Sequence, residues 1–327
     1  MENKKPLLSI CVLTYERANG LRETLQSIVR QFDDPEVCEC VEVVISDNAS
    51  TDNTSDIVKN FQNRFSNIKY YRNDVNIGFD RNVLNVVEKA TGSYCWYMAD
   101  DDMILDGVLE AVLGRLQGGA YDVITVESTP IPRVHDLTKK VEFSPKSFVE
   151  VQDGGEFQFR GYCQGGVSVL MFNRDLWLSV VDKDDILEHW LYYETVLRAL
   201  IASHKKKLYI QQPCVATGQD CRWAKGGNEL FTFVNSNVLL QRMIGIGFDR
   251  KRVLWELREN SKSILIILLR AKGNGLPCTL ANLSYIYNNL RGVSVLRLML
   301  STAIYFVPNW IVAMIRDARK KVVVLLK

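Results

Sequence analysis

The sequence predicts an α/β fold in which helices flank a central, mostly parallel β-sheet, followed by a helical C-terminal region. In the first hundred residues, short apolar β-rich segments alternate with segments of helical periodicity. This alternation is typical of βαβ units with right-handed crossovers. From about residue 228 the pattern is almost wholly helical. We therefore expect one domain over residues 1–227, with halves 1–115 and 116–227, and a helical region over 228–327.

The individual elements follow from the periodicity of the apolar residues. Four β-rich segments predict strands at 7–14, 41–46, 68–72 and 94–98, and three segments of helical spacing predict helices at 21–31, 54–65 and 81–90. Further along, we expect a helix at 106–116, a strand at 122–126, a variable loop or hairpin region at 127–160, a buried strand at 165–172 and a helix at 191–203.

Composition and charge narrow the class of protein. Forty basic and 38 acidic residues leave a net charge of +2, which gives no reason to expect a nucleic-acid partner. Eight cysteines lack paired CxxC spacing and there are only three histidines, so a zinc site is not expected. The N-terminus enters a strand at once, without the apolar segment of a signal peptide. We therefore expect a reducing, cytoplasmic location.

Polar residues follow each of the first four predicted strands, at 14–17, 47–52, 73–82 and 100–102. Parallel strands bring such junctions to one edge of the sheet, where ligands bind in open α/β folds. The last junction holds three adjacent carboxylates, which repel one another unless a cation neutralises them. Mg²⁺ and Mn²⁺ are often held by one or two carboxylates plus substrate phosphates. A solvated loop that caps a helix is the simpler account of this triplet taken alone.

The ordered segments SICVLTYER, SDNASTD, NIGFDRN and ATGSY, the last leading to DDD at 100–102, resemble family 2 glycosyltransferases of the GT-A fold. The likeness is close over about residues 6–115 and fainter to about 205. Within the family, the sequence is similar to a bacterial subgroup whose members add sugars, including abequose-type deoxysugars, to lipid-linked O-antigen or capsule units. The resemblance implies a nucleotide-diphosphate sugar donor, Mn²⁺ or Mg²⁺, and inverting transfer to a glycan acceptor such as a polyprenyl-diphosphate-linked one.

The resemblance also implies roles for single residues. Asp47 stands at the position of the aspartate that contacts the base, and Arg81 at the position near the diphosphate. Glu16 stands where many members have asparagine, which puts that base contact in doubt. The predicted donor-binding set is Thr14, Tyr15, Glu16, Arg17, Asp47, Asn76, Gly78, Arg81 and Asp100.

The acidic triplet departs from the common Asp-x-Asp-Asp motif of the family. Counted from the preceding glycine, Ala99 takes the place of the usual first aspartate. By this count Asp101 is the expected metal ligand, with Asp102 as the residue after it. The alternative pairs Asp100 with Asp102.

Inversion requires a general base within hydrogen-bond reach of the acceptor hydroxyl. Relatives place a carboxylate, often in a Glu-Asp pair, at the start of a helix that corresponds to residues 182–194 here, but no clean pair is present. Glu188 and His189 lie closest to the expected place, and Asp185 is next. An almost equally good account is that Asp184 and Asp185 cap a helix while Glu188 points into water.

An uncharged stretch at 298–315 is just long enough to be a transmembrane candidate, but Pro308 interrupts it. We expect this region to lie at a membrane surface instead, with basic residues 316–321 at the head groups and aromatic residues at the boundary. The aromatic residues are Tyr305, Phe306 and Trp310. The expected location is thus peripheral, on the inner face of the cell membrane. A buried helical subdomain or a dimer interface is the alternative.

Two other functions stay open. A sugar-phosphate nucleotidyltransferase shares the topology but would need a glycine-rich, basic phosphate loop after the first strand, which residues 14–17 do not provide. An inactive carbohydrate-binding or scaffold protein is conceivable because of Ala99 and the missing Glu-Asp pair. The function that we predict is a metal-dependent, inverting glycosyltransferase of the hexosyltransferase class.

Overall fold

The structure, a computed structural model, describes residues 5–131, 138–218 and 226–314. It divides into two compact units, which are described one at a time. The first comprises Met1–Ile186 and Leu191–Asp220, and the second comprises Leu187–Trp190 and Cys221–Lys327.

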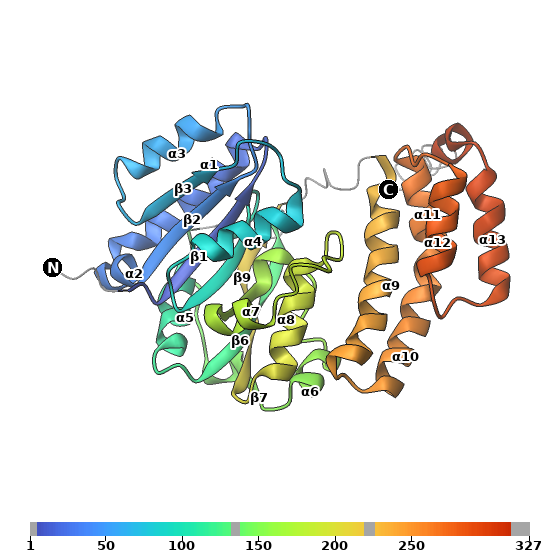
Figure 1. Ribbon diagram of the computed structural model, residues 1–327. Coiled ribbons are helices and arrows are strands. Elements are labelled where there is room, and N and C mark those ends of the chain that lie inside the picture. Colours follow the sequence, from blue (N-terminus) through green and yellow to red (C-terminus); the bar gives the residue numbers. More distant parts are fainter. Residues whose placement is uncertain (1–4, 132–137, 219–225, 315–327) are drawn as a thin grey trace, which may run out of the picture. The chain divides into compact units, whose positions relative to one another are not determined.

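The first unit is built on one sheet, which has nine strands in the described chain (Figure 1). The strand order is β3-β2-β1-β4-β8-β6-β9-β5, and β7 pairs with β9. The strands are β1 Leu8–Thr14, β2 Val41–Asp47, β3 Ile68–Arg72, β4 Tyr94–Ala99, β5 Met103–Ile104, β6 Tyr121–Pro130, β7 Phe148–Val151, β8 Leu170–Asn173 and β9 Lys206–Thr217.

The four strands predicted in the first hundred residues form a parallel block. Strand β1 pairs with β2 and β4, and β2 pairs with β3, all in parallel. Every residue of β1 and β2 is buried, as expected for parallel strands with both faces covered. In the register, Thr14 lies opposite Asp47, and Leu13 opposite Ala99. The carboxyl ends of the three strands are therefore level, which places their junctions side by side.

The second half of the sheet is mixed. Strand β8 runs antiparallel to β4 and β6, whereas β6 and β9 are parallel. The expected strand at 165–172 is instead a 3₁₀ turn, Val167–Val169, followed by the shorter strand β8. The turn lets Ser168 accept the Trp96 indole N–H at its carbonyl, 2.8 Å away. The region 127–160, expected to be a loop or hairpin, includes the end of β6, β7 and a short helix.

Helices surround this sheet in the order that the sequence predicts, with small additions. Helix α5 begins two residues later than expected because Gly107 has a left-handed φ of +79°, and the preceding Asp106 instead accepts a hydrogen bond from Arg30, with Nε 2.5 Å from Oδ1. The helices are α1 Ala18–Val29, α2 Pro35–Cys40, α3 Thr54–Gln62, α4 Phe79–Lys89, α5 Val108–Leu116, α6 Gly154–Phe159, α7 Arg174–Val180 and α8 Leu191–Ala202.

The second unit is helical, as the sequence predicts for this part of the chain. Its helices are α9 Asn228–Ile246, α10 Arg250–Asn260, α11 Ile264–Gly273, α12 Leu280–Asn289 and α13 Val295–Phe306. They enclose an apolar core that includes Leu230, Val234, Leu268 and Leu276. Among the described residues, no helix combines the length and the apolarity needed to cross a bilayer.

Of the three aromatic residues predicted to lie at the membrane boundary, one is buried, so the prediction is wrong for that residue. Tyr305 is only 1% exposed, and its hydroxyl donates to the Thr279 carbonyl at 2.7 Å, so its ring belongs to the core of the unit. Phe306 and Trp310 are well exposed. The basic residues 316–321 lie outside the described residues.

Candidate functional site

Hydrogen bonds join the first strand-end junction to the second and to the fourth. Thr14 donates its hydroxyl to Asp100, with 2.8 Å between Oγ1 and Oδ2. The Glu16 amide donates to Ser50 Oγ at 2.9 Å, and the Thr51 amide donates to Glu16 Oε1 at 2.7 Å. The Glu16 side chain thus ties the first junction to the second. This is a structural role for the residue that replaces the usual asparagine.

The third junction is attached through a pair of asparagines. Asn48 Nδ2 donates to Asn76 Oδ1 at 2.8 Å, and the Ile77 amide donates to Asn48 Oδ1 at 2.9 Å. Gly78 follows with φ +84° and is the residue from which helix α4 begins. Arg81 lies exposed in the first turn of this helix, a position where partial positive charge from the backbone favours anions.

Two residues of these loops have an unusual backbone. Glu16 has φ +52° and Ala49 has φ +68°. This is a left-handed backbone conformation that residues other than glycine and asparagine seldom adopt. Such strain persists only where neighbouring contacts impose it, and it clusters at ligand sites. At Glu16, the hydrogen bonds to Ser50 and Thr51 hold this conformation in place.

Asp47 is fully buried, and both of its oxygens have partners within the protein. Oδ1 accepts from the Ser50 amide at 2.9 Å, and Oδ2 accepts from the Tyr70 hydroxyl at 2.6 Å. Burial, and then this hydrogen bond, raise the pKa of Tyr70 well above its ordinary value. Asp47 therefore shapes the second junction, and its contact with a nucleotide base stays a prediction.

Asp100 is the buried anchor of the acidic loop. Its Oδ2 accepts from Thr14 and, at 3.3 Å, from the Tyr15 amide, while its Oδ1 lies 3.1 Å from Arg17 Nη1. Burial raises the pKa of its carboxyl to about 6, against the lowering effects of Arg17 and Thr14. These contacts tie Asp100 to the first junction, which favours a supporting role for it over the alternative role of metal ligand.

Asp102 is held by two residues that the sequence analysis missed. Ser168 Oγ donates to Asp102 Oδ2 at 2.6 Å, and the Gly218 amide donates to Oδ1 at 2.9 Å. Burial raises the pKa of Asp102 to about 6, against the lowering effect of both donors. Ser168 lies in the segment expected to be a strand, and Gly218 directly follows β9. No local signal marks either residue, because the strand that Gly218 follows was not predicted.

The acidic loop could bind a hard divalent cation for which the protein supplies only some of the ligands. The Asp101 side chain is 20% exposed and supplies carboxylate oxygens, and the hydrogen-bonded carboxylate of Asp102 has the fixed orientation usual in metal ligands. In the described chain, no three His, Cys, Asp or Glu side chains converge as a metal centre. The remaining ligands would then be diphosphate oxygens and water, which suits Mg²⁺ or Mn²⁺.

The candidates for the general base are found in the segment before α8. Glu188 has 76% of its side chain exposed, and its Oε1 lies 3.8 Å from His189 Nε2. His189 has φ +67°, a second case of a strained backbone at a predicted site residue. The Asp185 amide donates to Asp182 Oδ1 at 3.1 Å. Glu188 and His189 belong to the second compact unit.

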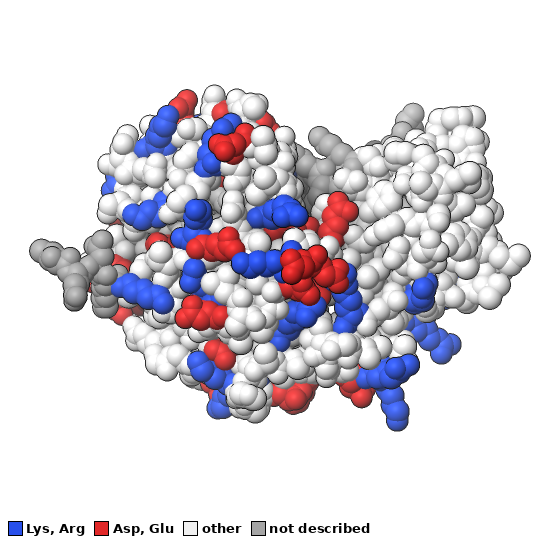
Figure 2. All heavy atoms as spheres, in the orientation of Figure 1, with Lys and Arg blue, Asp and Glu red and all other residues white. Residues whose placement is uncertain are grey.

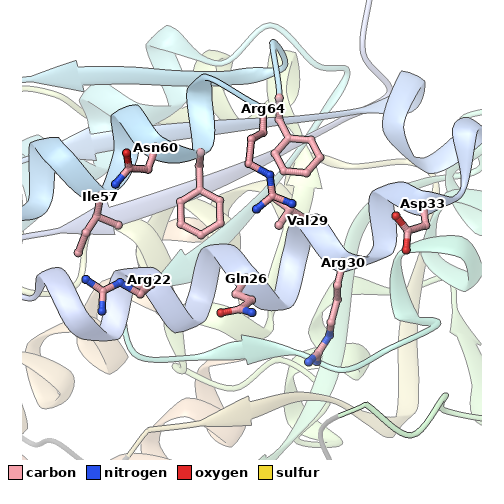
Figure 3. Close-up of a pocket in the computed structure, with 10 residues that line it drawn as sticks. Arg22, Gln26, Val29, Arg30, Asp33, Ile57, Asn60 and Arg64 are labelled. Carbon is pink, nitrogen blue, oxygen red and sulfur yellow. The ribbon is translucent and has the colours of Figure 1, made fainter.

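A hollow of about 460 Å³ lies elsewhere in the first unit, between α1 and α3. Figure 3 shows Arg22 on α1 extending towards Ile57 and Asn60 of α3. None of the predicted site residues lines this hollow. Arg22 therefore lines a hollow that is separate from the predicted site residues.

Comparison with known proteins identifies the family. The sequence model described as "Glycosyl transferase family 2" matches residues 9–174, which is more than half of the chain. The chain belongs to glycosyl transferase family 2. The resemblance stated from the sequence is thereby confirmed, and the matched residues include all four strand-end junctions.

Curated relatives cover shorter parts of the chain. The abequosyltransferase RfbV of Salmonella typhimurium is 42% identical over 99 residues, which are 30% of this chain and 29% of the relative. The GalNAc(5)-diNAcBac-PP-undecaprenol beta-1,3-glucosyltransferase of Campylobacter jejuni is 29% identical over 163 residues, or 46% of this chain and 50% of the relative. The alignments thus span at most half of the length of either relative.

Solved structures share the fold. S. aureus TarS 1-349 in complex with UDP gives a TM-score of 0.57 at 16% identity, covering 96% of this chain and 91% of that chain. The mannosyltransferase PcManGT from Pyrobaculum calidifontis, in complex with GDP-Man and Mn²⁺, gives 0.52 at 14% identity, covering 97% of this chain and 88% of that chain. The predicted α/β fold of GT-A type is therefore confirmed.

Proposed function

We propose that this chain is a metal-dependent, inverting glycosyltransferase, of the hexosyltransferase class, that moves a sugar from a nucleoside-diphosphate donor to a lipid-linked glycan. One observation carries the proposal: hydrogen bonds cross-link the first, second and fourth strand-end junctions, and the Ser50 that bonds to Glu16 also donates its amide to Asp47. Membership of family 2 supports transferase chemistry. The names of the two curated relatives, one of which acts on an undecaprenol-linked glycan, support the class of acceptor.

In this proposal the donor lies along the carboxyl edge of the sheet. Asp47 would accept a hydrogen bond from the base, and Arg81 with the first turn of α4 would bind the diphosphate. Asp101 and Asp102 would hold Mg²⁺ or Mn²⁺, which neutralises charge on the diphosphate leaving group when it is bound. Ser168 and Gly218 act on this step by fixing the orientation of the Asp102 carboxylate.

Transfer with inversion is a single displacement at the anomeric carbon. The acceptor hydroxyl must lose its proton as it attacks. We propose that Glu188 or His189 is the general base that accepts this proton, with Asp185 as the next candidate. The hydrogen bond from the Leu191 amide to Asp80 Oδ1, at 3.1 Å, fixes the start of α8 directly after the first two candidates.

Association with a membrane is part of the same proposal. A stripe of apolar side chains along α13 and the residues after it is between 44% and 74% exposed; we call it the α13 stripe, and it consists of Val295, Leu296, Met299, Leu300, Phe306, Trp310 and Met314. Figure 2 shows the visible surface over α12 and α13 almost free of Lys, Arg, Asp and Glu. An apolar face of this kind suits the head-group boundary of a bilayer, where a lipid-linked acceptor is located.

The test is a transfer assay on the full chain with a panel of nucleotide sugars, with Mn²⁺ or with EDTA. Asp101→Asn should lower metal-dependent transfer by roughly 100-fold or more, because it removes charge from the metal site. Asp33→Asn, which changes an exposed acid of the hollow, is the matched control. Turnover with release of nucleoside diphosphate excludes both alternatives. Absence of turnover with every donor supports the scaffold, and formation of a nucleotide sugar from a sugar phosphate supports the nucleotidyltransferase.

A further inference from the structure

Arg17 lies between two of the three carboxylates of the acidic loop. Its Nη1 is 2.9 Å from Asp101 Oδ2 and 3.1 Å from Asp100 Oδ1, and its side chain is only 15% exposed. A guanidinium in this position neutralises part of the charge that the triplet accumulates. It also contacts an oxygen of the residue that we expect to bind the metal ion.

Two glycines bring the chain close to this ion pair. At Gly20, a Cβ atom would lie 2.5 Å from the Asp100 carbonyl oxygen and 3.2 Å from Arg17 Cγ. At Gly218, a Cβ atom would lie 2.8 Å from Asp101 Oδ2. Gly218, which follows β9, therefore lies against the Asp101 carboxylate, and the first turn of α1 at Gly20 lies against the Asp100 backbone and the stem of Arg17.

We propose that Arg17 is a built-in counter-cation that competes with the divalent metal for Asp101, so that the metal binds well only together with a nucleoside diphosphate. This inference rests on the proposed function. A divalent cation on the Asp101 carboxylate would stand next to the guanidinium in a largely enclosed place, where like charges repel with little screening. A diphosphate brings negative charge that both cations can share. Arg17 thus couples the binding of the metal to that of the donor.

The experiment measures Mn²⁺ binding to the full chain without nucleotide, by electron paramagnetic resonance of free Mn²⁺. Arg17→Gln should bind Mn²⁺ more tightly than the unchanged protein by on the order of 10-fold, a usual size for coupling between two sites. Arg22→Gln makes the same change of charge at the hollow that is separate from the predicted site residues, and it should leave the affinity unchanged. Equal or weaker Mn²⁺ binding by Arg17→Gln would overturn the inference.

Two further variants cover the case in which Arg17→Gln does not fold. Arg17→Met removes the charge but keeps an apolar stem against Gly20, and it should show the same gain in affinity. Arg17→Lys keeps the charge and should stay close to the unchanged protein. A gain with lysine equal to that with methionine would contradict competition by charge.

A second arm repeats the titration with saturating UDP or GDP, and with the matching monophosphates. The diphosphates should raise Mn²⁺ affinity more in the unchanged protein than in Arg17→Gln, and the monophosphates should raise it less. If no diphosphate promotes Mn²⁺ binding to the unchanged protein, the metal site of the proposed function fails. If the diphosphates promote binding but Arg17→Gln has no effect in their absence, only the role of Arg17 fails.

Discussion

Thr14 and Asp100 are 86 residues apart in the chain, and the Thr14 hydroxyl donates to the Asp100 carboxylate with 2.8 Å between Oγ1 and Oδ2. Both side chains are buried. The bond joins the end of β1 to the loop after β4, so the first junction and the acidic loop form one structural element.

Replacement of Thr14 by valine should lower the free energy of unfolding by about 1–2 kcal/mol, because a buried carboxylate loses a donor while the volume of the side chain is kept. Chemical denaturation measures this change. Thr14→Ser keeps the hydroxyl and should retain most of the stability. Equal losses for valine and serine would show that the methyl group, and not the hydrogen bond, stabilises the loop.

Asp100 and Asp102 predict how stability depends on pH in metal-free protein. Each has a folded-state pKa of about 6, against an ordinary value of 3.8. Between these values the folded state binds more protons than the unfolded state, so that stability increases as pH falls. From about pH 7.5 to about 5.5, each carboxyl should contribute a gain of about 1 kcal/mol. Chemical denaturation in EDTA measures this pH dependence of the free energy of unfolding. The prediction is contradicted if the difference in stability between Asp102→Asn and the unchanged protein does not vary with pH.

Asp47 can be tested separately for its structural and its binding role. Asp47→Asn should weaken binding of a nucleoside monophosphate by roughly 10-fold with or without metal, because the base loses a charged acceptor. Tyr70→Phe removes an internal partner of the same carboxylate, and it should lower stability by about 1 kcal/mol while affinity is kept. Calorimetric titration and denaturation provide the two readouts. Unchanged affinity in Asp47→Asn would leave Asp47 as a turn residue only.

The general base should be revealed by variants that spare donor binding. Glu188→Gln or His189→Asn should slow transfer by roughly 100-fold, because proton removal by a positioned base contributes on that order. Asparagine also tolerates the positive φ of residue 189. A histidine base is protonated at higher pH than a carboxylate base, so the acid limb of the pH–rate profile distinguishes them. Asp184→Asn is the control, and less than a few-fold slowing by both variants would place the base elsewhere.

The α13 stripe should bind the protein to anionic liposomes, which co-sedimentation measures. Leu296→Glu combined with Met299→Glu should reduce liposome binding by on the order of 100-fold, since each such side chain kept out of an interface forfeits about 1–2 kcal/mol. Leu254→Glu alters an exposed leucine of α10 in the same unit and should have little effect. If the unchanged protein does not bind liposomes, the membrane proposal fails, and the alternative of a buried helical subdomain or a dimer interface is favoured.

What the sequence could predict was mostly local. Runs such as residues 41–46 are apolar and β-rich, so the strands of the parallel block were found within one or two residues. The place of the acidic loop followed, because parallel strands end at one edge. Strand β9 was missed, since Pro213 and two glutamines interrupt its apolar pattern, and its pairing with β6 shifts register at that point.

The contacts that tune the site were not predictable in this way. Ser168 and Gly218 reach Asp102 from 66 and 116 residues further along the chain, and no local pattern encodes such a meeting. The hydrogen bond from the Thr51 amide to Glu16 was equally unpredictable. A glutamate in place of asparagine indicates that the usual contact differs, but it does not indicate the new partner. The competition that we infer at Arg17 likewise depends on a guanidinium position that spacing alone does not give.

The amide of Gly218 has a consequence for how the protein is made. The ribosome releases β1 to β4 first, and these four strands pair with one another. Asp102, however, waits for a donor that directly follows β9, more than one hundred residues later. During synthesis, β1 to β4 can therefore form while the Asp102 carboxylate still lacks its Gly218 donor, and the hydrogen bonds of the acidic loop are complete only when the residue after β9 has been made.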